Sequence, residues 1–146
     1  MLAPMNEATF VHLISDETPP GLADALSGAS LTGYTEIHLE PDPARTCQKI
    51  ATSTFAKTLI IIATSNACSQ LPAVALAQRA SGKTILRYEL VEPNLPRFTD
   101  SWPQSPITAY FSVGSTIPRD LTLRGINVAE FEDVDALAQF IRNSLL

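Results

Sequence analysis

The sequence has little of what holds small secreted or metal-binding proteins together. It contains two cysteines, Cys47 and Cys68, and two histidines, His12 and His38, among 146 residues. The cysteines are far apart and no histidine cluster accompanies them, which argues against a zinc site. A chain of this length can bury a core without disulfides. We therefore expect a cytoplasmic protein without a bound metal or cofactor.

The sequence also lacks basic runs and long hydrophobic runs. Ten lysines and arginines are scattered singly against fifteen acidic residues, for a net charge of −5. This argues against a nucleic-acid duplex as partner, because neutralising its phosphates takes clustered cations. The apolar run "LIIIA" is too short to span a bilayer, and "MLAPMNEATF" does not resemble a signal peptide. We expect no membrane partner.

Apolar runs alternate regularly with helical patterns. Strands are expected at 9–15, 34–40, 58–65, 83–91 and 126–133, and helices at 18–28, 42–56, 69–81 and 134–146. Thr18 and Asp42 are predicted helix caps, each followed by proline. This order predicts a single α/β domain over residues 1–146. Its expected fold is a three-layer sandwich with a mostly parallel sheet of about five strands, flavodoxin-like or Rossmann-like.

The segment 92–125 interrupts the alternation. It contains five prolines, the only tryptophan, Trp102, and one apolar run, "ITAYFSV". A long Pro-rich segment inside a compact domain usually has a function. We expect it to be a lid or an interaction surface.

In parallel sheets, ligands bind beyond the carboxyl ends of the strands. Of the loops expected there, 64–69 is the best phosphate candidate, because Ser65, Asn66, Ser69 and the free amides before a helix offer donors. It contains no glycine, so neither a P-loop nor the dinucleotide fingerprint is present. The alternative is that Ser69 only caps the helix.

Acidic residues and Cys68 suggest further sites. Asp16 and Glu17 follow a strand and are compatible with magnesium, as in response-regulator receivers, but no aspartate follows the third strand. The alternative is that these carboxylates only stabilise the N-terminus of the following helix through its dipole. Cys68 precedes a helix, which can lower a thiol pKa.

Two carboxylates, Glu89 and Glu130, lie in predicted strands and are the best placed to reach the cleft. The alternating pattern of a strand puts Arg87 and Glu89 on one face. The alternative for Glu89 is therefore a simple ion pair with Arg87.

The segments "STFAKTLIIIATSNACSQLPAVALAQRASGKTIL" and "GINVAEFEDVDALAQFIRNSLL" resemble the nucleoside 2-deoxyribosyltransferase superfamily, including deoxynucleoside-monophosphate N-glycosidases. They cover about half of the chain. The position of the family's catalytic glutamate is Val74, so the resemblance implies a nucleoside- or nucleotide-binding domain without glycosidic chemistry. Any remaining activity would need Glu89 or Glu130 as the catalytic residue. The binding residues implied are Ser15, Asp16, Thr64, Ser65, Asn66, Ser69 and Trp102.

Two other functions stay open. One is a protein-interaction module that uses segment 92–125, with Trp102 as its anchor. The other is a flavodoxin-like flavin binder, because "SDETPPG" occupies the place of the flavodoxin phosphate loop. The "LIII" run and the Ala-rich helix are also compatible with a homodimer.

Overall fold

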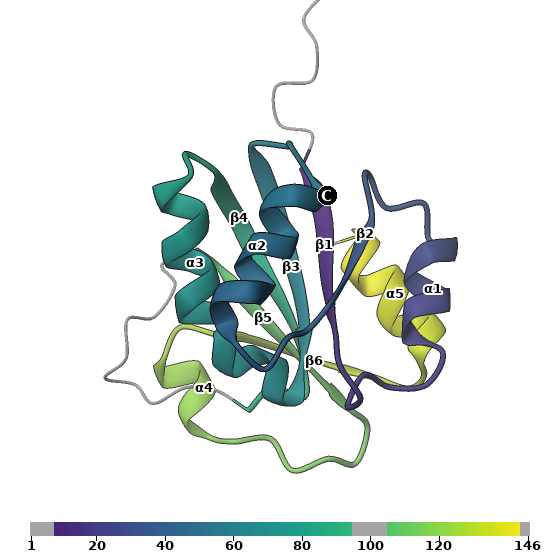
Figure 1. The fold of residues 1–146 in the computed structure, drawn as a ribbon. Helices are drawn as coiled ribbons and strands as arrows, with labels where there is room; N and C mark the ends of the chain where they lie inside the picture. Colours follow the sequence, from purple (N-terminus) through teal and green to yellow (C-terminus); the bar gives the residue numbers. More distant parts are fainter. Residues whose placement is uncertain (1–7, 95–104, 144–146) are drawn as a thin grey trace, which may run out of the picture.

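A computed structural model describes residues 8–94 and 105–143 (Figure 1). They form one six-stranded sheet in the order β2-β1-β3-β4-β5-β6, and every neighbouring pair is parallel. The first five positions have the flavodoxin-like order. The α/β fold class is therefore confirmed. The strands are β1 (Thr9–Ile14), β2 (Thr35–His38), β3 (Thr58–Thr64), β4 (Thr84–Val91), β5 (Ile107–Ser112) and β6 (Asn127–Phe131).

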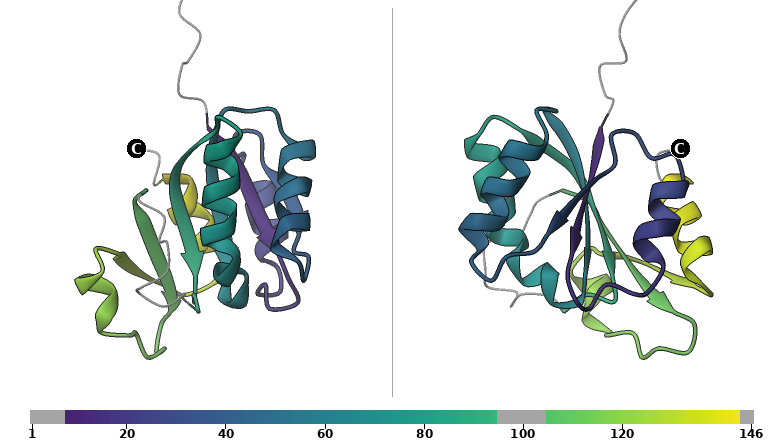
Figure 2. Two further views of the ribbon diagram at one scale, coloured as in Figure 1. Left: turned by 60° about the vertical axis from the view of Figure 1, so that its left-hand side comes forward. Right: turned by 45° about the vertical axis from the view of Figure 1, so that its right-hand side comes forward.

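Helices cover both faces of the sheet (Figures 1 and 2). α1 (Leu22–Gly28) and α5 (Val134–Asn143) pack together on one face, and α2 (Pro43–Ser53) and α3 (Leu71–Ala80) on the other. The short α4 (Asp120–Leu123) adds Leu121 to the α2/α3 layer. A 3-10 helix, η1 (Ser65–Gln70), joins β3 to α3. No helix among the described residues is long and apolar enough to cross a bilayer.

The central strand β3 explains why the sheet has two apolar layers. Leu59, Ile61 and Ala63 belong to the core under α2 and α3, whereas Ile60 and Ile62 belong to the core under α1 and α5. All five side chains are fully buried. A strand covered on both faces needs a continuous apolar run, which is what the sequence has here.

The sheet has one strand more than the predicted five. The additional strand is β5, which lies within the Pro-rich segment 92–125 and pairs with both β4 and β6. Part of that segment is therefore built into the sheet. Its apolar run, "ITAYFSV", stands out in the sequence, but the prolines on either side favoured a lid or an interaction surface over a strand.

The two predicted helix caps have different outcomes. Asp42 accepts a hydrogen bond from the Ala44 amide (3.0 Å) at the start of α2, as predicted. The prediction for Thr18 is wrong, because α1 begins at Leu22 after Gly21, whose φ is 83°. The Thr18 hydroxyl instead accepts a hydrogen bond from the Ser15 amide (3.0 Å) and shapes the loop.

Candidate functional site

The strand order reverses between β1 and β3, and their carboxyl ends lie at the lower edge of the sheet in Figure 1. Open α/β sheets bind ligands in the crevice at such a switch point. The loops that follow β1, β3, β4 and β5 meet along this edge, where side chains from distant parts of the sequence form two polar networks. We call this region the carboxyl edge.

Two residues of the carboxyl edge have left-handed backbones. Ser65 (φ 48°) follows β3 directly, and Glu92 (φ 44°) follows β4. This conformation costs a non-glycine residue roughly 1 to 2 kcal/mol. Backbone hydrogen bonds hold both turns, from the Asn94 amide to the Ser65 carbonyl (3.2 Å) and from the Glu92 amide to the Tyr110 carbonyl (2.8 Å). Strain at adjacent strand ends is typical of ligand sites.

The first polar network joins the loops after β1, β3 and β4. Glu17 accepts hydrogen bonds from the Asn66 backbone amide (3.0 Å) and the Asn66 side-chain amide (3.1 Å). The Asn66 side-chain oxygen in turn accepts from the side-chain amide of Asn94. A carboxylate therefore already holds an amide at the start of η1, where we expected a phosphate to bind.

The second polar network lies between the ends of β4 and β5. One oxygen of Glu92 accepts hydrogen bonds from the Ser112 amide (3.1 Å), the Ser112 hydroxyl (2.6 Å) and the Ser115 hydroxyl (3.1 Å). The Ser112 hydroxyl, more than any other contact, lowers the pKa of Glu92 below its usual range. The carboxylate is therefore ionised at neutral pH.

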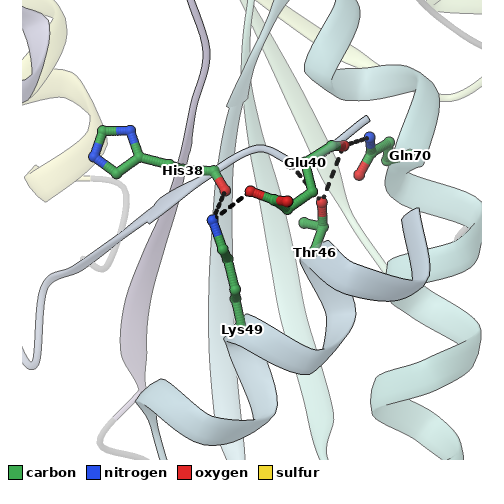
Figure 3. A network of polar contacts seen from close by, with 5 residues as sticks. All are labelled: His38, Glu40, Thr46, Lys49 and Gln70. Atoms are coloured by element: carbon green, nitrogen blue, oxygen red, sulfur yellow. Dashed lines mark hydrogen bonds and ion pairs between the residues drawn. The ribbon is translucent and has the colours of Figure 1, made fainter. Parts of the chain in front are cut away.

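A third set of contacts fixes the end of β2 (Figure 3). The Lys49 ammonium donates to a Glu40 carboxylate oxygen (2.7 Å) and to the His38 carbonyl (3.1 Å), and its hydrogen bond and charge lower the pKa of Glu40. The Gln70 amide donates to the Glu40 carbonyl (2.7 Å), which ties the loop after β2 to the end of η1. The His38 ring points away from this network.

A hollow of about 300 Å³ adjoins the first network. It lies between the end of β4 and α4, and Asn94 belongs to both the hollow and the network. Its other polar side chains are Asp120 and Arg124, which form an ion pair at 3.8 Å. The lining therefore contains one charge of each sign.

Most of the predicted binding residues do gather at the carboxyl edge. Ser15 accepts a hydrogen bond from the Glu17 amide (3.2 Å), Asp16 is exposed, and Thr64 is buried beneath the turn at Ser65. The predicted open loop 64–69 is instead the 3-10 helix η1, and the Ser69 hydroxyl donates to the Asn66 carbonyl (2.7 Å) without capping α3. Trp102 lies outside the described residues.

The two catalytic candidates are not brought together. Glu89 is fully buried within β4 and forms an ion pair with Arg87 at 2.8 Å, which is the alternative that the sequence left open. Glu130 is exposed on the edge strand β6. In the register of the sheet, Glu89 is paired with Thr108 of β5 and Glu130 with Phe111 of β5. Thr108 and Phe111 are three residues apart in one strand, so the side chains of Glu89 and Glu130 lie on opposite faces of the sheet. They cannot act as a pair.

Cys68 does not have the environment of a reactive thiol. Its side chain is fully buried in the core under α2 and α3. Burial is the largest influence and raises the thiol pKa, which overrides the helix-terminus effect expected from the sequence.

Sequence reasoning missed the residues that make most of the contacts at the carboxyl edge. Glu17 was considered only as part of an acid pair, and Glu92, Asn94, Ser112 and Ser115 were not considered as site residues. Their common signal was their place at the carboxyl end of a strand or within three residues after it. It went unused for Ser112 and Ser115 because β5 itself was not predicted.

Comparisons with known proteins show the fold alone. No protein-family model matches the sequence. No curated protein matches it either. A similar solved structure is the thioesterase domain SrfTE, which cyclises the lipopeptide antibiotic surfactin. The TM-score is 0.63 at 12% identity, over 96% of this chain and 91% of that chain.

Proposed function

We propose that this protein binds a small uncharged polar ligand, a nucleoside, at the carboxyl edge, and that it has no glycosidic activity. The observation that carries the proposal is the chain of contacts Glu17–Asn66–Asn94 beside the hollow at the end of β4. Amides and carboxylates are suited to the donors and acceptors on the edges of a nucleobase.

The size of the hollow supports this ligand class. Pockets for small organic ligands are usually about 300 to 1,000 Å³, and the hollow beside Asn94, at about 300 Å³, is at the lower end of that range. A nucleoside is a small organic ligand and therefore suits a pocket at the lower end of this range. The resemblance to nucleoside-processing enzymes points to the same class.

The charges at the carboxyl edge favour a nucleoside over a nucleotide. Glu17 holds the Asn66 amide, and Glu92 is ionised nearby. A phosphate at η1 would have to displace a carboxylate and would face its negative charge. The same repulsion acts against the phosphate of flavin mononucleotide.

A thermal-shift series tests the proposal with nucleosides, their monophosphates and flavin mononucleotide. A nucleoside at a hundred times its dissociation constant should raise Tm by roughly 5 to 10 °C. Asn94→Ala should abolish this shift. Asn127→Ala is the matched control, because Asn127 is exposed at the start of β6, at the opposite end of the sheet from the carboxyl edge, and it should leave the shift unchanged. The absence of a shift with any nucleoside would refute the proposal.

Glu17→Gln tests the charge argument separately. The glutamine oxygen can still accept from the Asn66 amide, but the negative charge is gone. Monophosphates should then bind better relative to nucleosides than they do to the wild type. An unchanged preference would show that Glu17 does not set the ligand's charge.

A second function, acyl transfer through Ser65, is favoured by one observation. Ser65 stands on a left-handed turn between a central strand and a helix, as the nucleophile does in α/β-hydrolases, and SrfTE is a thioesterase. We rank it lower because the hydroxyl needs a base. His12 is buried beside Tyr34, and the His38 ring points away from the polar contacts around Glu40.

The contacts of the backbone amide that follows Ser65 are a second argument against acyl transfer. In hydrolases that amide stabilises the oxyanion, but here the Asn66 amide is bound to Glu17. An assay for hydrolysis of a thioester distinguishes acyl transfer from ligand binding alone. Turnover that is lost in Ser65→Ala would establish acyl transfer, whereas equal background rates in both proteins would exclude it.

A further inference from the structure

A second hollow, of about 200 Å³, lies between α3 and β4. It is far from the carboxyl edge, because it includes the last turn of α3 and the start of β4 (Figure 2). Its lining combines cationic, hydroxyl and apolar side chains: Arg79, Lys83, Tyr88, Ser105, Ala75 and Ile85.

Neither cation of this hollow has a carboxylate partner among the described residues. The ion pairs of residues 8–94 and 105–143 involve Lys49, Arg87 and Arg124, but neither Arg79 nor Lys83. The Lys83 ammonium donates to a neutral group, the Thr54 carbonyl (2.9 Å). In a chain with fifteen acidic and ten basic residues, two unpaired cations at one hollow leave a local positive field.

Tyr88 adds a hydrogen-bond donor to the lining of the same hollow. Its side chain is 1% exposed, yet it lines the hollow. Burial is the largest influence on the phenol and raises its pKa, whereas the positive charge of Arg79, which lines the same hollow, lowers it. The hydroxyl is therefore protonated at neutral pH and available to donate.

We propose that this hollow binds a small anion, with Arg79 and Lys83 supplying the charge and Tyr88 a hydrogen bond. Its volume of about 200 Å³ is below the range of pockets for drug-sized ligands. It therefore accommodates an inorganic anion or the anionic end of a longer ligand. Phosphate and carboxylate share the chemistry that these side chains recognise.

Titration of the isotopically labelled protein with inorganic phosphate, followed by NMR at constant ionic strength, tests the site. The amides of residues 83–85 should shift and saturate. Arg79→Gln and Lys83→Gln should each weaken binding roughly tenfold, because each removes one charge-assisted contact. Tyr88→Phe should weaken it less, because it removes a neutral donor. Parallel titrations with sulfate and acetate distinguish a tetrahedral anion from a carboxylate.

Lys57→Gln is the matched control. Lys57 is an exposed cation whose carbonyl accepts from the Thr84 amide (2.7 Å), so it is close to the start of β4 but does not line the hollow. It should bind phosphate like the wild type. Shifts that never saturate, or an equal loss in Lys57→Gln, would overturn the proposal. The dispersion of each spectrum shows whether the variant is folded.

Discussion

The buried histidine of β1 should make the protein sensitive to mild acid. His12 is fully buried. Its Nδ1 lies 2.8 Å from the Tyr34 hydroxyl, which donates its only proton to Glu36 (3.0 Å). Nδ1 must therefore carry the hydrogen and Nε2 the lone pair. Nε2 is buried without a partner in the described part of the chain, so a proton added there would have no acceptor.

The pKa shift of His12 gives the size of the effect. Burial lowers its pKa from 6.5 to about 4. Between these values the unfolded chain binds a proton that the folded protein does not, so stability falls as the pH falls. The loss is about 3 kcal/mol in full and about 2 kcal/mol between pH 7.5 and pH 5. That is a large part of the 5 to 15 kcal/mol that stabilises typical domains.

Urea unfolding at pH 7.5, 6 and 5 measures this dependence. His12→Asn keeps a donor for Tyr34 but cannot titrate. It should be less stable at pH 7.5 because its side chain is smaller, and it should lose about 2 kcal/mol less than the wild type on acidification. Leu13→Ala, at a fully buried residue of the same strand that cannot titrate, should be less stable at every pH but keep the wild-type slope. If His12→Asn and the wild type differ by less than about 0.5 kcal/mol in this loss, the burial of neutral His12 does not cause the acid sensitivity.

Three substitutions test the packing and the turns by urea unfolding. Ile61→Ala in the centre of β3 should cost about 2 to 5 kcal/mol, because it leaves a cavity in a fully buried layer; a cost below about 1 kcal/mol would contradict this packing. Asp42→Ala should cost about 1 kcal/mol through loss of the cap on the Ala44 amide, whereas Asp42→Asn should cost little. Gly33→Ala should cost at least about 1 kcal/mol, because Gly33 has φ 61° and a Cβ would lie 2.7 Å from the Thr9 hydroxyl oxygen. Wild-type stability in Gly33→Ala would mean that this turn differs from the one described.

Several features of the fold followed from short-range patterns. The continuous run of β3 predicted a strand covered on both faces, and the Asp42–Pro43 pair predicted the start of α2. Both are effects of neighbouring residues on one another. The alternation of strands and helices then limited the fold to a parallel sheet with helices on both faces, because only right-handed crossovers connect such elements compactly.

The candidate site depended on contacts that no local pattern contains. Glu17, Asn66 and Asn94 are separated by 49 and 28 positions, and Glu92 and Ser112 by 20. Which of these polar groups meet depends on strand order and register. A shift of one residue also moves a side chain to the other face of the sheet.

The sequence alone was thus enough to establish the fold class and the edge of the sheet where polar loops gather, because hydrophobic periodicity and helix caps act over a few residues. Only the tertiary structure determined that the Glu17 carboxylate accepts a hydrogen bond from the Asn66 amide and that Glu89 is buried in an ion pair with Arg87. It also determined that Arg79 and Lys83 line the same hollow. These outcomes depend on which distant side chains are brought within a few ångströms of one another, and packing of the whole chain sets those distances.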